Sequence, residues 1–373
     1  MRSHGNFTLI VFSDVNFSPQ LFAILQELHN RKKAFRVILI GDPTVTLARQ
    51  IKAQEWNSRV IPKRGKLGSA LYLLVIGTEV MKDRPSALFA SGQYATAISM
   101  LAGSILNVKK RIFIRHHSNF HHKNNMRLGM LVDKMANYLS TEIVAVSVVV
   151  KDILILSEAV KPEKVRLIHN GINLNNFKST SPVLKEVLMR YFGKVSLFHI
   201  GVVSRLTEWK GVEYTARAFV RLQKEFPNSR LHIVGAFADS YLDVKNILST
   251  VPESVYTLDK INSNIPLFLK KLDVFVHVPV GMQDEAFGIV YIEALASRIP
   301  CIFTQSGVIN ELDAPDNHAH IVAFRNTEEI YMNLKRMIEG INATKIEVPE
   351  LWLNQFSLDV MAKSYAELLL GKS

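Results

Sequence analysis

The chain has 373 residues, 48% of them apolar, which is enough for two domains with substantial cores. A single cysteine, Cys301, excludes an internal disulfide framework and is typical of a reducing compartment. The first apolar run, residues 7–12, is too short for a signal peptide, and no later run is long enough to span a membrane, so we expect a cytoplasmic protein.

The net charge of +12 lies in the first half of the chain. Residues 1–180 hold 25 Lys and Arg against 11 Asp and Glu, whereas residues 181–373 hold 20 against 22. A basic first half predicts an anionic partner, which can be nucleic acid, an anionic membrane or a phosphorylated acceptor. Aromatic residues are not interleaved with the basic ones in a stacking pattern, so nucleic acid is the weakest of the three and we expect none.

Short runs rich in β-branched residues alternate with helical patterns along this first half. Helices are predicted at residues 20–31 and 67–82, and strands at residues 7–12, 36–40, 87–90, 111–115, 143–146 and 165–168. Ser18 and Pro19 read as the N-cap and first turn of the first helix. Asp14 and Asn16 stand in the loop before it.

The alternation restarts in the second half, with strands predicted at residues 196–200, 230–234, 255–258, 274–277, 300–304 and 319–322. Strand–helix alternation twice over predicts an α/β protein with two Rossmann-like, doubly wound parallel sheets, joined by the polar stretch 170–194. Ligands bind beyond the carboxyl ends of such strands, so we expect a central cleft between the domains. The expected domains are residues 1–173, residues 174–350, and a last helix in residues 351–373 that returns to the first domain.

The run HIGVVSRLTEWKG in the second half suits an anion. It places Gly201, Arg205 and Lys210 after a strand, with Gly211 before a helix. Small residues after a strand let backbone approach an anion, and two cations five positions apart neutralise a diphosphate. Two solvated loop cations are an equally good interpretation of this run alone. The run LHIVGAFADS repeats the strand–glycine ending at Gly235.

Two glutamates, Glu285 and Glu293, stand eight positions apart in QDEAFGIVYIEALASRIP. The first precedes a loop and the second lies inside the helix that follows, which leaves the N–H groups of residues 287–290 to an anion. This arrangement suits a nucleotide-sugar, with the diphosphate on the helix end and hydroxyls on the two carboxylates. From spacing alone, an amphipathic helix with solvated glutamates is at least as good an interpretation.

The run RIFIRHHSNFHHK places four histidines, His116, His117, His121 and His122, after a strand end. The paired spacing matches no common zinc pattern and the cysteine lies elsewhere, so we expect no metal site. A polar surface loop is the simpler interpretation for His121 and His122.

Taken in order, these motifs resemble the retaining glycosyltransferases of the GT-B superfamily, specifically glycosyltransferase family 4 (glycosyl transferases group 1). VAVSVVVKDIL resembles the family's strand ending in Val-Ser, and VRLIHNGINLNNF its Asn-Gly-Ile-Asp…Phe motif, with Asn173 in place of Asp. GVVSRLTEWKG resembles the Gly-Arg-Leu…Lys-Gly phosphate loop, and DEAFGIVYIEALA the double-glutamate motif. The likeness covers residues 140–325 well and the first 140 residues in outline.

The resemblance implies roles for the matching residues. The catalytic set is His116, Arg205, Lys210 and Glu285, with the two cations on the donor diphosphate and Glu285 on the sugar hydroxyls. The donor-binding set is Gly201, Gly235, Tyr256, Lys260, Ile265, Phe287, Gly288, Ile289, Val290 and Glu293, with Glu293 on the ribose. The acceptor-side set is Asp14, Asn16, Arg115 and His117, with Arg115 toward an acceptor phosphate. No metal or other cofactor is required, because the cations and the helix dipole take its place.

The implied activity is metal-independent, retaining transfer of a hexose or N-acetylhexosamine from a nucleotide-diphosphate sugar. A UDP-sugar is the favoured donor, and the acceptor is a glycan or lipid-linked molecule of cell-surface polysaccharide or glycolipid synthesis. The alternatives are a GDP-mannose-dependent mannosyltransferase, a phosphorylase or epimerase of the same fold, and a non-catalytic nucleotide-sugar-binding protein. Basic residues at 63–66 and the run NNMRLGMLVDK predict peripheral contact with the cytoplasmic face of an anionic membrane.

Besides Asn173, the chain departs from the family pattern in one turn and at two positions. The first strand–helix turn, FSDVNFSPQ, lacks the usual glycine pair, and Ala286 replaces a glycine of the donor loop. Arg298 stands where a glycine normally ends the helix after Glu293, and a left-handed residue there costs about 1 kcal/mol.

Overall fold

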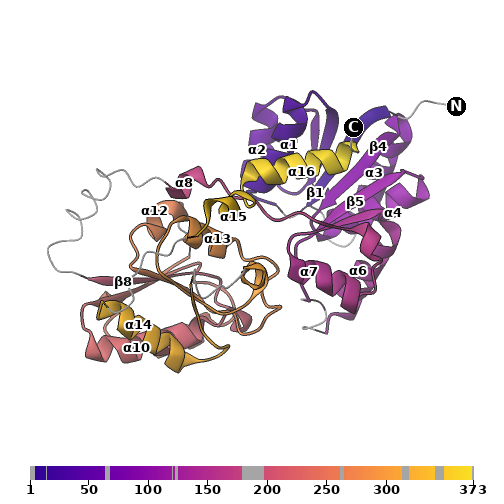
Figure 1. Ribbon diagram of the computed structural model, residues 1–373. Helices are drawn as coiled ribbons and strands as arrows, with labels where there is room; N and C mark the ends of the chain where they lie inside the picture. The colour runs from indigo at the N-terminus through magenta and orange to yellow at the C-terminus, as the bar shows by residue number, and fades with distance from the viewer. Residues whose placement is uncertain are drawn as a thin grey trace. The chain divides into compact units, whose positions relative to one another are not determined.

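The computed structural model describes residues 5–13, 15–63, 68–119, 121, 125–178, 197–260, 264–312, 319–340 and 348–371. The chain divides into two compact units, each an open parallel sheet with helices (Figure 1). Unit 1 comprises Met1–Ile172 and Gln355–Ser373, and unit 2 comprises Asn173–Asn354. The prediction of two doubly wound, Rossmann-like sheets is confirmed. Of the join expected at residues 170–194, residues 179–194 lie outside the described part of the chain.

Unit 1 holds a seven-stranded parallel sheet in the order β3-β2-β1-β4-β5-β6-β7. Its strands are β1 Gly5–Ser13, β2 Ala34–Ile40, β3 Ser58–Ile61, β4 Pro85–Ser91, β5 Lys110–Arg115, β6 Glu142–Ala145 and β7 Val165–Leu167. The sequence predicts all of them except β3, an edge strand of four residues. Only its last residue is buried, so β3 lacks the apolar alternation that marks a strand.

The helices of unit 1 are α1 Pro19–Asn30, α2 Thr46–Ala53, α3 Gly68–Asp83, α4 Gln93–Ile105, α6 Arg127–Leu139, α7 Val148–Asp152 and α16 Leu358–Leu370. The predicted start of α1 is confirmed, because Ser18 Oγ accepts the Leu21 N–H at 3.1 Å and Pro19 follows. Helix α1 turns Leu21, Ile24, Leu25 and Leu28 into the core.

The last helix, α16, belongs to unit 1, where it packs beside α1 (Figure 1). Its buried Tyr365 lies with its ring centroid 5.7 Å from that of Phe89 in β4. Before α16 begins, Ser357 pairs with Ile172, and a Cβ on Gly171 would meet the Ser357 carbonyl oxygen at 2.7 Å. The two segments of unit 1 are therefore in direct backbone contact where the chain leaves and re-enters the unit.

Unit 2 holds a six-stranded parallel sheet in the order β10-β9-β8-β11-β12-β13. Its strands are β8 Phe198–Val203, β9 Ser229–Val234, β10 Tyr256–Asp259, β11 Val274–His277, β12 Cys301–Phe303 and β13 His320–Ile321. Its helices are α8 Asn175–Lys178, α10 Val212–Glu225, α11 Tyr241–Leu248, α12 Ile265–Leu269, α13 Ile289–Ala296, α14 Thr327–Ile338 and α15 Glu350–Asn354. Apolar residues of β8, β9, α10 and α14 form the core on one face, where Figure 1 shows α10 and α14 together.

The other face of this sheet packs against α13 through aromatic rings. Tyr291 of α13 meets Phe303 of β12 with ring centroids 4.7 Å apart and His277 of β11 at 4.8 Å, both edge to face. Because Tyr291 is fully buried, α13 is held firmly over the carboxyl ends of β11 and β12. In an open parallel sheet this end is where ligands bind.

Candidate functional site

Glu285 lies in the loop between β11 and α13 and is only 7% exposed. Its Oε1 lies 2.8 Å from Nε2 of His277 and accepts a second hydrogen bond from Nζ of Lys210. Burial alone would raise the pKa of this carboxyl, but the bond from His277 and the charge of Lys210 lower it to about 2. Glu285 is therefore a fixed carboxylate with an orienting partner on each side.

The backbone around Glu285 is held by the loop that follows β12. The Glu285 N–H donates to Ser306 Oγ at 3.2 Å, and that hydroxyl donates in turn to the Gly281 carbonyl at 2.8 Å. Gly307 has φ +57°, and a Cβ there would lie 2.6 Å from the Phe287 carbonyl oxygen and 2.8 Å from Glu285 Cβ. Only glycine fits this approach, so the carboxylate has little freedom to move.

His277 belongs to this site but was not predicted from the sequence. It ends β11, is 2% exposed, and has its pKa lowered because burial and the charge of Lys210 outweigh Glu285. The neutral ring donates its Nε2–H to Glu285, and Nδ1 has no hydrogen-bond partner among the described atoms. The sequence does contain a signal for this residue, because His277 is the last residue of the apolar strand VFVH. Ligands bind at the carboxyl ends of such strands, so a polar residue at that position is a candidate for the site.

The start of α13 lies beside this carboxylate. Gly288 precedes the helix with φ +80°, and a Cβ on it would lie 3.6 Å from Glu285 Cδ and 2.4 Å from the Tyr291 ring. No side chain caps the helix there, and the first N–H groups, those of Ile289 and Val290, have no acceptor within the helix. The positive end of α13 is thus open to an anion next to a fixed carboxylate.

Glu293 lies just over one turn into α13 and is half-buried. Loss of hydration raises its pKa to about 7, so that near neutral pH it exists in both protonation states. It differs in this respect from Glu285, which is ionised over the whole physiological range. The two glutamates are chemically distinct in spite of their shared motif.

Glycines bring the two cations of the phosphate loop to this end of the sheet. A Cβ on Gly211, which has φ +67°, would lie 2.0 Å from the Val278 carbonyl oxygen, so the Lys210 loop packs directly on the chain after β11. A Cβ on Gly235, with φ +88°, would lie 2.7 Å from the Ser204 carbonyl oxygen, next to Arg205. Arg205 is exposed and forms no ion pair with any described residue.

Gly201 lies inside β8 rather than at its end, and a Cβ on it would meet the Leu272 side chain at 2.1 Å. The lack of a side chain at Gly201 therefore leaves room for packing, and its assignment to the donor stays a prediction. Tyr256 begins β10, Lys260 follows this strand, and Ile265 begins α12, so all three lie at or after the edge strand of the sheet.

Two of the four acceptor-side residues, Arg115 and His117, line a cavity of about 190 Å³ in unit 1. Gly92, Gln93, Thr96, His116, His117 and His121 are among its lining residues. Ser91 Oγ lies 3.0 Å from Nε2 of His116, so the end of β4 orients that histidine after β5. Asp14 and His122 lie outside the described residues.

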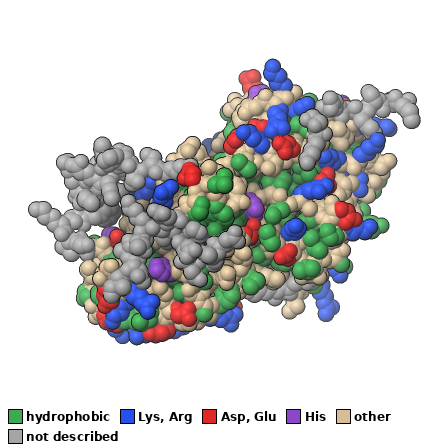
Figure 2. Space-filling model, in the orientation of Figure 1, with side chains coloured by type: hydrophobic (Ala, Val, Ile, Leu, Met, Phe, Trp, Pro, Cys, Tyr) green, Lys and Arg blue, Asp and Glu red, His purple; other side chains and the backbone are tan. Residues whose placement is uncertain are grey.

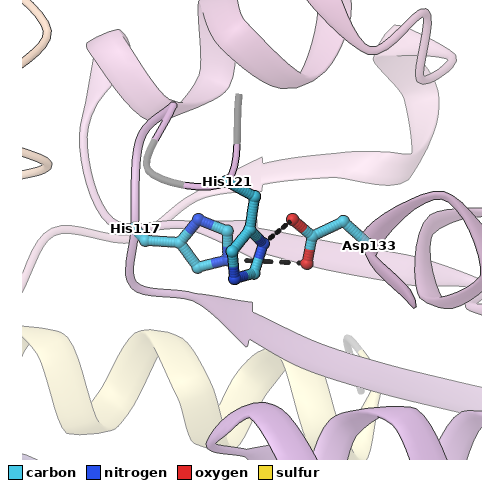
Figure 3. A group of neighbouring side chains, drawn as sticks. All are labelled: His117, His121 and Asp133. Carbon is cyan, nitrogen blue, oxygen red and sulfur yellow. Dashed lines mark hydrogen bonds and ion pairs between the residues drawn. The ribbon is translucent and has the colours of Figure 1, made fainter. Parts of the chain in front are cut away.

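The expectation that His121 lies in a polar surface loop is wrong, because this side chain is 4% exposed and bonded to Asp133 (Figure 3). Arg115 also lines the cavity, but it is 2% exposed and forms ion pairs with Glu158 and, at 3.3 Å, with Asp133. Only its Nη1 has no partner among the described atoms, so an acceptor phosphate would compete with these two carboxylates for the guanidinium.

Asn16 has a structural role in the first loop. Its Oδ1 accepts the Thr46 N–H at 3.3 Å and its carbonyl oxygen accepts the Leu47 N–H at 2.9 Å. The residue preceding α2 makes no side-chain cap, so Asn16 supplies the acceptors for the N–H groups of the first turn instead.

Comparison with known proteins points to one family. Residues 197–340 match the family model described as glycosyl transferases group 1. The alpha-monoglucosyldiacylglycerol synthase of Acholeplasma laidlawii is 27% identical over 212 residues, which make up 55% of this chain and 52% of that protein. The capsular polysaccharide biosynthesis glycosyltransferase CapM of Staphylococcus aureus is 27% identical over 179 residues, 47% of this chain and 46% of that protein. The chain thus spans about half the length of these relatives.

The fold has solved counterparts. HepE of Anabaena, determined in complex with UDP and glucose, superimposes with a TM-score of 0.79 at 19% identity, covering 97% of this chain and 99% of that chain. The GT-B class predicted from the sequence is confirmed by this likeness. In the described part of the chain, no helix combines the length and apolar character needed to cross a membrane.

Proposed function

Since this chain belongs to the GT-B glycosyltransferases of the family 4 type, we propose that it transfers a hexose or N-acetylhexosamine, with retention, from a nucleotide-diphosphate sugar. The acceptor is a glycan or lipid-linked molecule of polysaccharide or glycolipid synthesis, the two kinds of product named for its relatives. A UDP-sugar is the favoured donor, because HepE was solved with UDP.

The observation that carries this proposal is the fixed Glu285 carboxylate beside the open start of α13. Its pairing with Lys210 and His277 leaves one oxygen, Oε2, with no hydrogen bond to the described residues and so available to sugar hydroxyls. The N–H groups at the start of α13 are placed for the diphosphate of the same donor. Glu293, further along α13, is assigned to the ribose hydroxyls.

Charge determines the mechanism we propose. As the bond to the sugar breaks, negative charge builds on the leaving diphosphate, and Arg205, Lys210 and the positive end of α13 offset it without a divalent ion. The departing phosphate takes the acceptor's proton while the acceptor attacks from the same face. Holding both substrates in contact supplies a large part of the rate, and His116 lies at the sugar in this scheme.

Replacing the cations tests this assignment. Arg205→Ala should lower kcat with a panel of UDP- and GDP-sugars about 10²–10³-fold and affect donor KM less, because the cation acts mainly in the transition state. Arg217→Ala removes an exposed arginine of the same unit, on α10, and is the matched control. Unchanged turnover in Arg205→Ala would exclude the proposed role, and no donor hydrolysis or thermal shift with any nucleotide-sugar would exclude the function.

The same panel separates the alternatives. Preference for GDP-mannose would identify a mannosyltransferase. Isomerisation of the donor without acceptor would identify an epimerase, and dependence on inorganic phosphate a phosphorylase. Tight binding without any turnover would identify a nucleotide-sugar-binding protein. Each of these outcomes contradicts transfer from a UDP-sugar.

The exposed face of α6 suits the anionic membrane surface that we propose as a partner. This face comprises Arg127, Leu128, Leu131, Lys134 and Tyr138. Leu128, Leu131 and Tyr138 are 76%, 63% and 84% exposed, whereas the only acid of the helix, Asp133, is buried. Figure 2 shows apolar, basic and acidic side chains interspersed on unit 1 in the region where Figure 1 places α6. Exposed apolar and basic residues on one helix face favour binding in the headgroup layer.

Vesicle sedimentation tests this surface. The protein should bind vesicles with anionic lipids more than neutral ones, and less at high salt. Leu128→Ser with Leu131→Ser should release it, whereas the control Leu242→Ser, at a 66% exposed position of α11, should not. Equal sedimentation of both variants would contradict a role for α6.

A further inference from the structure

His117, His121 and Asp133 of unit 1 turn toward one another (Figure 3). Their possible ligand atoms all lie within 4.8 Å of one another. His121 Nδ1 lies 2.6 Å from one carboxylate oxygen of Asp133, and His117 Nε2 lies 3.5 Å from the other. We propose that these three side chains bind one transition-metal ion, for which Zn²⁺ is the best match. The proposed ligands include none of the donor-binding residues, although His117 also belongs to the acceptor-side set.

The fold builds this cluster from two elements. The chain after β5 supplies the two histidines, and α6 supplies Asp133. One turn earlier on α6, Gly129 leaves the space that His121 occupies, because a Cβ there would lie 2.7 Å from the ring. Gly129 and Asp133 lie on the same helix face and together provide the space and the hydrogen-bond acceptor for the His121 ring. A histidine on a surface loop would need neither.

The hydrogen bonding of His117 is incomplete without an ion. Its Nε2 faces the cluster, and its one contact there is the Asp133 carboxylate at 3.5 Å, which is long for a hydrogen bond (Figure 3). The nitrogen that faces the cluster is therefore not committed to a close hydrogen bond and can serve as a ligand atom. Two imidazoles and one carboxylate are a set that holds Zn²⁺ with a fourth position left for water.

The charges around the cluster permit a cation. Arg115 lies 3.3 Å from Asp133 and would oppose an ion, but it is ion-paired with Glu158, whose other oxygen accepts from Asn137 at 2.7 Å. With neutral imidazoles, the two carboxylates and one guanidinium leave a net negative charge for a divalent ion to offset.

Binding requires a small contraction. Zinc bonds of about 2.0–2.2 Å bring ligand atoms to roughly 3.5 Å from one another, so the widest of the present separations must shorten by about 1 Å. His121 either gives up its bond to Asp133 or keeps it and binds through the other nitrogen, with the carboxylate orienting the ring. The adjoining cavity provides an entry path and room for the fourth ligand. The ion would tie the chain after β5, with His116, to α6.

The test uses the full-length protein without an affinity tag. Equilibrium dialysis against ZnCl₂, read by elemental analysis, should give one Zn²⁺ per chain, and Co²⁺ should give the visible absorption of a four-coordinate ion. Zn²⁺ at about 100 times its dissociation constant should raise the Tm of unit 1 by roughly 5–10 °C. His117→Ala and Asp133→Asn should each weaken binding by more than the roughly 10–100-fold typical of a lost outer hydrogen bond.

Controls separate this site from ordinary surface binding. His29→Ala removes an exposed histidine of α1 and should leave both stoichiometry and affinity unchanged. If Asp133→Asn fails to fold, the Co²⁺ spectrum and the metal stoichiometry of the wild-type protein still show whether the site binds an ion. Wild-type protein that takes up no ion, or variants of the cluster that bind as well as His29→Ala, would overturn the proposal.

Discussion

Glu285 and Lys210 are a buried ion pair, and their mutual dependence is testable by thermal unfolding of unit 2. Lys210→Met or Glu285→Gln alone leaves one charge without its partner and should cost roughly 3–5 kcal/mol. The double substitution removes both charges and should cost clearly less than the sum of the two. The exposed pair Arg217–Glu213 gives the control, for which each step should cost under about 1 kcal/mol. Additive losses at Lys210 and Glu285 would mean that the pair is not coupled.

Glu293 should make the stability of unit 2 depend on pH. Its pKa is about 7 in the folded chain against 4.5 for a free side chain, so the folded state favours the protonated form. Its stabilising contribution is therefore complete below pH 4.5 and is lost as the pH rises through 7. Glu293→Gln should match wild type at pH 4.5 and be more stable at pH 8 by roughly 1–3 kcal/mol.

Unfolding in urea at several pH values measures this difference, with Glu253→Gln at an exposed position as control. A difference that is constant with pH would contradict the role of burial. The same variant should bind the donor more weakly, since an amide accepts fewer hydroxyl bonds than a carboxylate. Gain of stability with loss of binding is typical of a side chain retained for its ligand.

At the scale of elements, the N-cap of α1 is the clearest case of local sequence dictating structure. Ser18→Ala removes the acceptor of the Leu21 N–H and should destabilise unit 1 by about 1 kcal/mol, whereas Ser18→Asp keeps an acceptor and should not. Chemical denaturation followed by circular dichroism measures both. Equal losses in the two variants would show that the side chain contributes by packing instead.

The end of α13 has a non-glycine residue in a left-handed conformation, as expected from the sequence. Arg298 adopts φ +55°, the left-handed conformation for which glycine is the usual residue. Its guanidinium lies 3.5 Å from Glu350, both side chains being about half exposed, and such a pair contributes little. Caps, turns and strands of β-branched residues could be predicted from the sequence, because each depends on residues that are neighbours in the sequence. Strand β3 was not, because as an exposed edge it has no apolar signal.

For the whole molecule, the return of the chain to unit 1 makes α16 part of the first core. Tyr365→Ala opens a cavity against Phe89 and should destabilise unit 1 by roughly 3–5 kcal/mol without changing the unfolding of unit 2. Lys363→Ala, on the exposed side of the same helix, should change stability by less than about 0.5 kcal/mol. Calorimetry that resolves the two units measures both variants, and a shift confined to unit 2 would contradict this arrangement.

A residue of the site could be predicted where a short sequence motif identifies it, and could not where its role depends on distant parts of the chain. Lys210, Glu285 and Gly288 belong to short motifs, so sequence order was sufficient to select them. The contacts of His277 and Asp133 were missed because they form only when the sheet brings strand ends and helices together. The ion pairs of Arg115 were missed for the same reason, since its partners Glu158 and Asp133 lie far along the chain.

The divided first unit also affects the order in which the parts form on the ribosome. Its sheet is synthesised first, but α16, which packs against α1 and β4, is synthesised only after the whole of unit 2. At about 5–20 residues per second that interval is roughly 10–40 s, long compared with the folding of most single domains. Unit 2 is continuous in sequence and can finish first, which reverses the usual N-to-C order. A nascent chain of this protein therefore exposes apolar surface of unit 1 for as long as unit 2 takes to be synthesised, and this is the stage at which chaperones have most to protect.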